Sequence, residues 1–429
     1  MTRVDAKWVA PRPAAAGTTW LYSLLPLLAA IVLAAALHFG LQPAIGPFRT
    51  NVLMNIGINV ILAVSLNIVN GFTGQFSIGH AGFMAVGGYT AAAITYYTSF
   101  RVWGDALMHG GVLSGVPANG WLTAGDALFV GSCLAGGLVA AVAGYLVGLP
   151  SLRLRGDYLA IVTLGFGEIV RVLLQQSDSD IPYLAADVQR MSVWQMARHL
   201  GGSLGFSGVP FYTTPFWVWL FAAVTLLVAF RVKRSSYGRA FLSIREDETA
   251  AEAMGVALTR FKVRAFVLAA FFAGIAGGLF AHEIGTALNP RELGFMKSFD
   301  IVIMVVLGGM GSISGAALAA AILTILPEVL RSPPHVWPLG LVAIVFVLVV
   351  RRRAGGRAAL TLAAVTVALE AVRAVALWQG VNLADYRMVL YALSLVVMMI
   401  VRPQGLFGVH EIWDYRPLGR RRAATVAVG

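Results

Sequence analysis

The chain has 429 residues and a formal net charge of +12; 58% of its residues are hydrophobic and 12% are charged. A soluble domain carries about twice that charged fraction, so the composition excludes an ordinary soluble protein and is typical of an all-α polytopic membrane protein. The basic residues lie in short clusters between apolar runs, which favours membrane lipids over nucleic acid as the counter-charge. The single cysteine, Cys133, excludes an intrachain disulfide and a cysteine metal site.

The apolar runs predict about ten transmembrane helices, because one crossing needs about 20 residues. The first run follows three basic residues and is longer than the apolar core of a cleaved signal peptide, so we expect it to be retained. The predicted spans are 18–41, 51–70, 77–98, 127–149, 158–175, 214–231, 263–285, 336–350, 358–378 and 387–401.

The charge distribution predicts an orientation. A cytoplasmic N-terminus puts the basic loop 232–264 inside and the acidic loops 99–126 and 176–213 outside, as the positive-inside bias requires. The predicted parts are a cytoplasmic N-terminus (1–17), a core (18–331) containing the loop 232–264, an inserted helical hairpin (332–385), a final transmembrane helix (386–408) and a basic cytoplasmic tail (409–429).

A glycine-rich polar stretch joins the second and third predicted spans. Gly71 and Gly74 are expected to break the helix there. Irregular polar backbone persists at membrane depth only where it is buried in protein or lines a wet cavity. Gln75, Ser77 and His80 are therefore candidates either for lining a pathway or for structural hydrogen bonds that hold the break. The sequence leaves both interpretations open.

Small residues follow at i, i+4 spacing (Ser77, Ala81 and Ala85), which predicts close approach of another helix. The fifth span adds two more candidate pathway residues, Thr163 and Glu168. Glu168 precedes Arg171 by three residues, which favours an ion pair within the helix over a proton-relay carboxylate.

The loop 232–264 contains an acidic, alanine-rich stretch. Acidic residues near its start, good helix formers through its middle and a glycine at its end predict a short helix on the cytoplasmic face. The residues singled out are Glu246, Asp247, Glu248, Glu252 and Gly255. From the residues alone, a solvated surface helix without a partner is the simpler interpretation.

Residues 299–331 form a long apolar region whose middle is interrupted by glycines and a serine. A single crossing would place the arginines of 351–357 outside, against the charge bias. We therefore predict a broken or re-entrant unit, with one glycine-kinked helix as the alternative.

Five blocks in shared order resemble the permease subunits of bacterial branched-chain amino-acid ABC importers. They are NGFTGQFSIGHAGFMAVGGY from residue 70, LRLRGDYLAIVTLGFGEIVR from 152, GRAFLSIREDETAAEAMGV from 238, VLGGMGSISGA from 306 and RPQGLFG from 402. The second block resembles the longer permease of the pair. The chain departs from the family between Arg331 and Asp385, where relatives have almost no intervening sequence.

The resemblance implies a non-catalytic subunit of the bacterial inner membrane, with both termini cytoplasmic and no cofactor. It implies a translocation path shared with a homologous shorter permease, two ABC ATPases that hydrolyse ATP, and an extracytoplasmic substrate-binding protein. It also implies that the acidic helix of 246–255 is the coupling helix for the ATPases. Relatives with similar motifs serve urea and short amides, so the sequence does not identify the substrate.

Two other function classes were weighed against this one. The chain has no P-loop, because none of its four lysines follows a glycine, and it has no nucleophile elbow or zinc helix. This counts against an enzyme, and the acidic helix counts against a passive channel. An ion-gradient-driven secondary transporter is the alternative; it needs carboxylates at mid-membrane, and only Glu168 and Glu370 lie well inside predicted spans.

Overall fold

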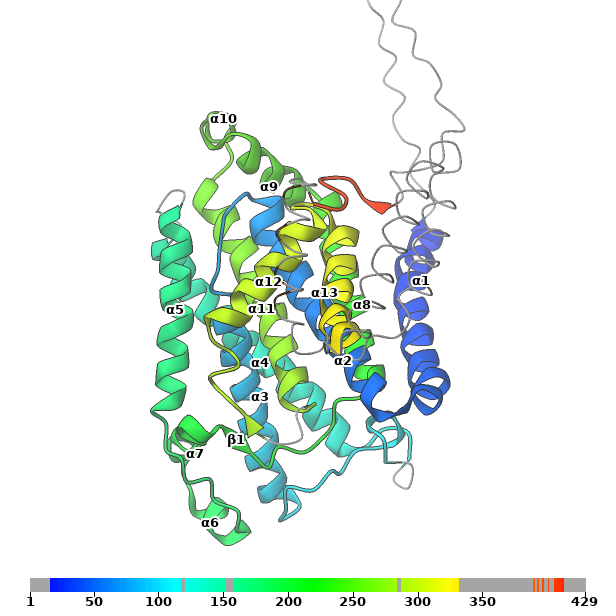
Figure 1. Cartoon of the computed structure of the whole chain (residues 1–429), viewed down its shortest axis with the longest axis vertical. Helices are drawn as coiled ribbons and strands as arrows, with labels where there is room; N and C mark the ends of the chain where they lie inside the picture. The colour runs from blue at the N-terminus through cyan, green and yellow to red at the C-terminus, as the bar shows by residue number, and fades with distance from the viewer. Residues whose placement is uncertain are drawn as a thin grey trace, which may run out of the picture.

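The computed structural model describes residues 16–116, 120–151, 157–283, 287–331 and 405–412, together with positions 389, 392, 396 and 400. Over these residues the chain is helical apart from loops and one two-stranded ribbon, which confirms the all-α membrane class (Figure 1). The predicted inserted hairpin and most of the final helix and basic tail lie outside the described residues.

The chain order of the helices and strands is as follows: α1 Ala16–Ala35, η1 Ala36–Leu41, α2 Gln42–Asn67, η2 Ile68–Phe72, α3 His80–Val102, η3 Val112–Ser114, α4 Ala124–Ser151, α5 Asp157–Gln175, α6 Ala185–Arg190, α7 Val193–Arg198, η5 Gly202–Leu204, β1 Phe206–Ser207, α8 Pro215–Arg234, α9 Ser236–Glu246, α10 Glu248–Ala253, α11 Leu258–Ala281, β2 Ala287–Leu288, α12 Phe295–Gly308 and α13 Ile313–Arg331.

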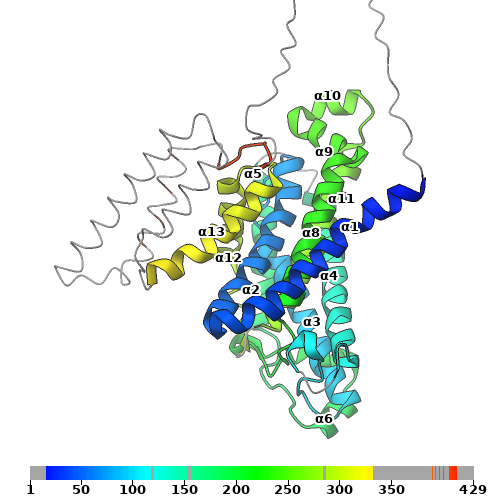
Figure 2. The same cartoon turned by 90° about the vertical axis from the view of Figure 1, so that its right-hand side faces the viewer.

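Five stretches of the described chain are long and apolar enough to cross a membrane: Leu25–Phe72, Ala124–Leu149, Tyr158–Gln175, Pro215–Arg234 and Leu258–Ala281. They make this a multi-pass membrane protein, while the predicted total of about ten crossings stays a prediction. The first stretch contains two predicted spans. Gly46 has φ +77 and precedes Pro47, so the chain turns there. Figure 2 shows α1 and α2 as two limbs that meet at this turn.

The core of the bundle is α11 packed against α3 and α4. Glycines allow these helices to approach closely: a Cβ on Gly87 would lie 2.2 Å from Cα of Gly274, and one on Gly277 would lie 1.9 Å from the carbonyl oxygen of Met84. Close approach was predicted from Ser77, Ala81 and Ala85, and the glycines of α3 also make close contacts that the sequence analysis did not single out. Without side chains, glycines bring the backbones of two helices into van der Waals contact.

Both predicted helix breaks are present. After η2 the chain is non-helical as far as Gly79, with Gly74 at φ +69, and α3 begins at His80. The predicted break within 299–331 separates α12 from α13, where Gly309 and Gly311 have φ +107 and +98. Because α12 and α13 pack against each other, the chain doubles back at this break. The unit begins at Phe295, four residues before the predicted start.

The two ends of the bundle differ. One end carries α9, α10 and the segment 405–412 (top of Figure 1). The other end carries α6, α7 and the ribbon in which Phe206 pairs with Leu288. The end with α9 and α10 also carries the basic residues of the loop 232–264, so it is the end predicted to be cytoplasmic.

Candidate functional site

The acidic stretch forms the short helix predicted from the sequence, and a second helix precedes it. Asp247 is the N-cap of α10, because its Oδ1 accepts hydrogen bonds from the backbone N–H of Thr249 (2.8 Å) and Ala250 (3.1 Å). Glu246 instead ends α9. Gly255 stops the helix at φ +84, a conformation that favours glycine. Together α9 and α10 form a helical hairpin, which we call the α9–α10 hairpin.

The outer surface of the α9–α10 hairpin is free for a partner within the described residues. Glu246, Asp247, Glu252 and Gly255 are exposed, and the neighbouring Met254 is 84% exposed. Glu248 differs, because it forms an ion pair of 2.6 Å with the buried Lys262 at the start of α11. Glu248 therefore fastens α10 to the bundle, while the other acidic residues point outward.

Arg245, in the last turn of α9, connects this hairpin to both helix breaks. Its Nη1 donates to the carbonyl oxygens of Gly71 (2.8 Å) and Met310 (3.3 Å). Gly71 belongs to the break after α2, and Met310 lies in the break between α12 and α13. Arg245 therefore links α9 by hydrogen bonds to two irregular segments of the chain.

The two breaks also contact each other. The side-chain amide of Asn67 accepts from the N–H of Gly311 and donates to the carbonyl of Ser312, both at 2.9 Å. A Cβ on Gly71 would lie 2.5 Å from the nitrogen of Gly311, so only glycine fits there. We call Asn67, Gly71, Gly311 and Ser312 the two-break junction.

The segment 405–412 covers the junction. Glu411 is 4% exposed and accepts hydrogen bonds from the backbone N–H groups of Ile313 (3.0 Å) and Ser314 (2.9 Å) at the start of α13. It also forms an ion pair with Lys233 at the end of α8. Burial would raise the pKa of this carboxyl, but the hydrogen bonds from Lys233, Ser314 and Ile313 prevail and hold its pKa below the ordinary value.

Three of the predicted pathway residues are buried and hydrogen-bonded. The backbone of Ser77 bonds to the side-chain amide of Asn70 through both its N–H and its C=O, and Nε2 of His80 lies 2.9 Å from Oγ of Ser65. Oγ1 of Thr163 accepts from the N–H of Ile78 at 3.1 Å. Ser77 and His80 thus make hydrogen bonds around the break, and a part of these residues in a pathway stays a prediction.

Gln75 and Glu168 differ from those three residues. Oε1 of Gln75 is buried without a hydrogen-bond partner among the described residues. Glu168 forms the predicted ion pair with Arg171 at 2.6 Å, and its other oxygen accepts from the N–H of Phe295 at 3.0 Å. Glu168 thereby joins α5 to the first turn of α12, a contact between distant segments that no local pattern predicts.

A charged group on α12 was missed at the sequence level. Nζ of Lys297 donates to Oδ1 of Asn59 at 3.2 Å, lies over the ring of Phe280 and interacts electrostatically with Asp300 and Glu283. Lys297 lies in the first turn of α12 and is half-buried. Its acidic neighbours Glu283 and Asp300 were not singled out from the sequence, and Glu370 lies outside the described residues.

Comparison with known proteins identifies the family. Residues 48–350 match the family described as branched-chain amino acid transport system/permease component. The high-affinity branched-chain amino acid transport system permease protein LivM of Salmonella typhimurium is 34% identical over 339 residues, covering 74% of this chain and 71% of that protein. The protein of the same name from Escherichia coli is 33% identical over 339 residues, which also cover 74% of this chain and 71% of that protein.

More distant relatives include a probable branched-chain amino acid transport permease protein LivM of Methanocaldococcus jannaschii, 24% identical over 55% of this chain and 66% of that protein. The autoinducer 2 import system permease protein LsrC of Yersinia pseudotuberculosis is 30% identical over 49% of this chain and 56% of that protein. No solved structure matches the chain significantly. On the extent of the family match and the identity to the two bacterial LivM proteins, the chain belongs to the permease components of branched-chain amino acid ABC transport systems.

Proposed function

We propose that this chain is a transmembrane subunit of an ATP-driven importer that carries a branched-chain or related small amino acid. It forms the translocation path with a second, homologous permease, receives substrate from an extracytoplasmic binding protein and is driven by two ABC ATPases. The relatives carry permease names for this class of substrate, which supports the assignment. ATP hydrolysis belongs to the partner subunits.

One observation carries the proposal: Arg245 ties the α9–α10 hairpin to both helix breaks. An ATPase that binds the exposed residues Glu246, Asp247, Glu252 and Gly255 moves this hairpin when it closes on ATP. The motion reaches the carbonyls of Gly71 and Met310 without an intervening flexible segment. A coupling role thus explains why a solvent-facing hairpin is hydrogen-bonded into the membrane region.

The same proposal assigns roles along the pathway. Gln75 is its best candidate lining residue, because its buried carbonyl oxygen has no partner among the described residues and can accept from a passing ammonium or water. Glu168 holds α5 to the start of α12. Ser77, His80 and Thr163 shape the break around the path through their hydrogen bonds.

The orientation follows from the charge pattern. The end with α9 and α10 faces the cytoplasm, together with both termini, and the end with α6, α7 and the ribbon faces out. The inserted hairpin at 332–385 adds two crossings to the core at 18–331 and leaves the final helix at 386–408 and the tail at 409–429 on their predicted sides.

The test is affinity purification of the tagged chain from its native membrane, followed by identification of co-purifying subunits and an ATP-dependent uptake assay. Glu252→Arg is expected to abolish co-purification of the ATPases, because it reverses an exposed charge on α10. Asp187→Arg makes the same charge change on an exposed residue of α6 at the opposite end and is expected to retain them. Uptake that persists without ATP and collapses with the proton gradient would overturn the proposal.

A further inference from the structure

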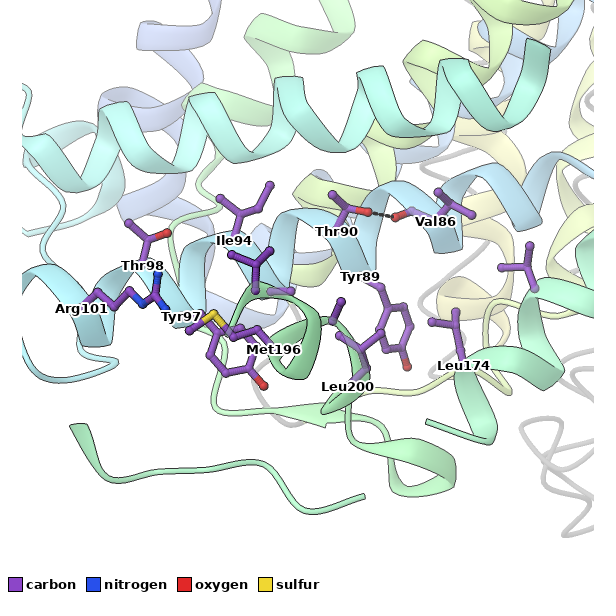
Figure 3. Close-up of a pocket in the computed structure, with 14 residues that line it drawn as sticks. Val86, Tyr89, Thr90, Ile94, Tyr97, Thr98, Arg101, Leu174, Met196 and Leu200 are labelled. Atoms are coloured by element: carbon purple, nitrogen blue, oxygen red, sulfur yellow. Dashed lines mark hydrogen bonds between the residues drawn. The ribbon is translucent and has the colours of Figure 1, made fainter. Parts of the chain in front are cut away.

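A groove of about 520 Å³ lies between α3, α5 and α7, toward the end of the bundle opposite α9 and α10 (Figure 3). Its walls are mostly aliphatic and aromatic side chains, including Val86, Ile94, Leu174, Met196 and Leu200. In a membrane protein, a groove of this composition beside outward-facing helices is filled by an apolar molecule.

Three hydroxyl groups along the groove are already engaged in hydrogen bonds. The hydroxyl of Tyr89 donates to the carbonyl of Leu288, and that of Tyr97 donates to the carbonyl of His199. The hydroxyl of Thr90 donates to the carbonyl of Val86 within α3. The groove therefore offers little to the charged backbone of a free amino acid, which separates it from the proposed translocation path.

The length of the groove matches one leaflet of a bilayer. Its lining runs along α3 from Val86 to Arg101, fifteen residues or about 22 Å at 1.5 Å per residue. Half of a hydrocarbon core is about 15 Å, and headgroups add several ångströms. The groove thus extends from near the middle of the membrane to headgroup depth.

A positive charge lies at the headgroup end. Arg101 lines the groove at the opposite extremity from Leu174, as Figure 3 shows. Its guanidinium donates to the carbonyl of Met191 at 2.8 Å, and the group has five N–H donors in a planar fork that suits phosphate oxygens.

The helix that closes the groove has the composition of an interfacial helix. Val193 and Trp194 of α7 are each 74% exposed, while Met196 is buried against the groove. Exposed tryptophan beside aliphatic side chains is typical of a helix at the membrane–water interface. The position of α7 therefore places Arg101 among the headgroups.

We propose that this groove is a phospholipid site, in which one acyl chain lies along α3 and the phosphate is held by Arg101. The occupant belongs to the leaflet in which α7 lies. The apolar lining, the one-leaflet length and the single cation at the interfacial end all fit this ligand. A bound lipid at this place fastens α5, which is otherwise the least enclosed span, to α3.

For the test, the purified transporter complex is reconstituted in vesicles of phosphatidylcholine that contain about one-fifth phosphatidylglycerol. The complex is then extracted again in mild detergent, and the lipids that it retains are counted by native mass spectrometry. Ala93→Phe fills the groove and is expected to remove one retained lipid per chain. Leu138→Phe, on the 60% exposed surface of α4, is the matched control and is expected to retain it. Equal lipid counts for the two variants would overturn the proposal.

Arg101→Gln changes an exposed side chain and keeps the test decisive if Ala93→Phe fails to fold. The retained phosphatidylglycerol is expected to fall to its bulk proportion, whereas Arg190→Gln on α6 leaves the enrichment unchanged. Because Cys133 is buried, Ile94→Cys offers one accessible thiol for a photo-crosslinker. An adduct of lipid mass supports the site, and an adduct with a second permease subunit overturns it.

Discussion

Arg245 and Gly71 are separated by 174 positions in the chain, yet the guanidinium of one donates a 2.8 Å hydrogen bond to the carbonyl of the other. The carbonyl is available because η2 ends at Phe72 and leaves the last carbonyls of the helix without intrahelical partners. A side chain of the surface helix α9 thereby supplies a hydrogen-bond donor to a carbonyl group at the end of a membrane helix. Arg245 therefore holds α9 against the chain that leads into the break before α3.

Arg245→Gln is expected to lower amino-acid uptake by about tenfold while the ATPases still co-purify. Hydrogen bonds to charged groups contribute about 1.5–3 kcal/mol, and 1.4 kcal/mol is a factor of ten. Arg239→Gln is the control, because among the described residues this exposed arginine of α9 bonds within its own helix, to Ser236. Equal uptake by the two variants in proteoliposomes would show that Arg245 transmits nothing.

Glu411→Gln is expected to destabilise the complex at neutral pH by about 3–5 kcal/mol, because it leaves Lys233 without its charge partner. The native carboxyl has a pKa below the ordinary 4.5, so its contribution is complete above pH 4.5 and is lost as the pH falls through the lowered value. Thermal unfolding followed from pH 7 to pH 3 is expected to show this acid loss in the native chain. The variant should lack that part of the pH dependence; an identical pH profile contradicts the assignment.

Local signals made α10 and both breaks predictable from the sequence. Asp247 and Gly255 are a cap and a stop that act within a few residues, and Gly74, Gly309 and Gly311 adopt the positive φ that glycine reaches most readily. The pairing of distant segments left no such signal. Nothing near Ser314 indicates that Glu411, 97 positions later, caps its helix.

Gly277→Ala is expected to destabilise the bundle by about 1–3 kcal/mol, because its Cβ would lie 1.9 Å from the backbone oxygen of Met84. Gly131→Ala on α4 meets nothing within 4 Å and is expected to be neutral or slightly stabilising, since alanine favours a helix over glycine. Unfolding temperatures of the two purified variants provide the measurement. A smaller loss for Gly277→Ala than for Gly131→Ala would be incompatible with the glycine contact between α3 and α11.

Lys297→Met is expected to lower expression and thermal stability, because it leaves the carboxylates of Glu283 and Asp300 without a nearby cation. Combining it with Glu283→Gln is expected to recover part of the loss, since removing both members of a charged pair costs less than removing one. A double-mutant cycle on unfolding temperature measures the coupling. Strictly additive effects would show that the two groups do not interact.

Lys297 also shows why part of the site escaped prediction. A search for apolar runs excludes charged residues from spans, so the predicted unit began at 299. The structure starts α12 at Phe295, where Glu168 of α5 caps the helix and Asn59 of α2 accepts from Lys297. These charges are neutralised by tertiary partners that are not adjacent in sequence, so local patterns do not reveal them.

The contact between the segment 405–412 and the break after α12 has a consequence for biosynthesis. The N–H groups of Leu406 and Phe407 donate to the carbonyls of Leu307 and Gly308, and a Cβ on Gly309 would lie 2.5 Å from the oxygen of Gly408. When Gly309 emerges from the ribosome during translation, residues 405–412, which cover it in the folded protein, have not yet been synthesised. The hairpin of α12 and α13 must therefore wait in the bilayer with those carbonyls uncovered, and a message truncated before codon 405 should yield a subunit that quality-control proteases remove.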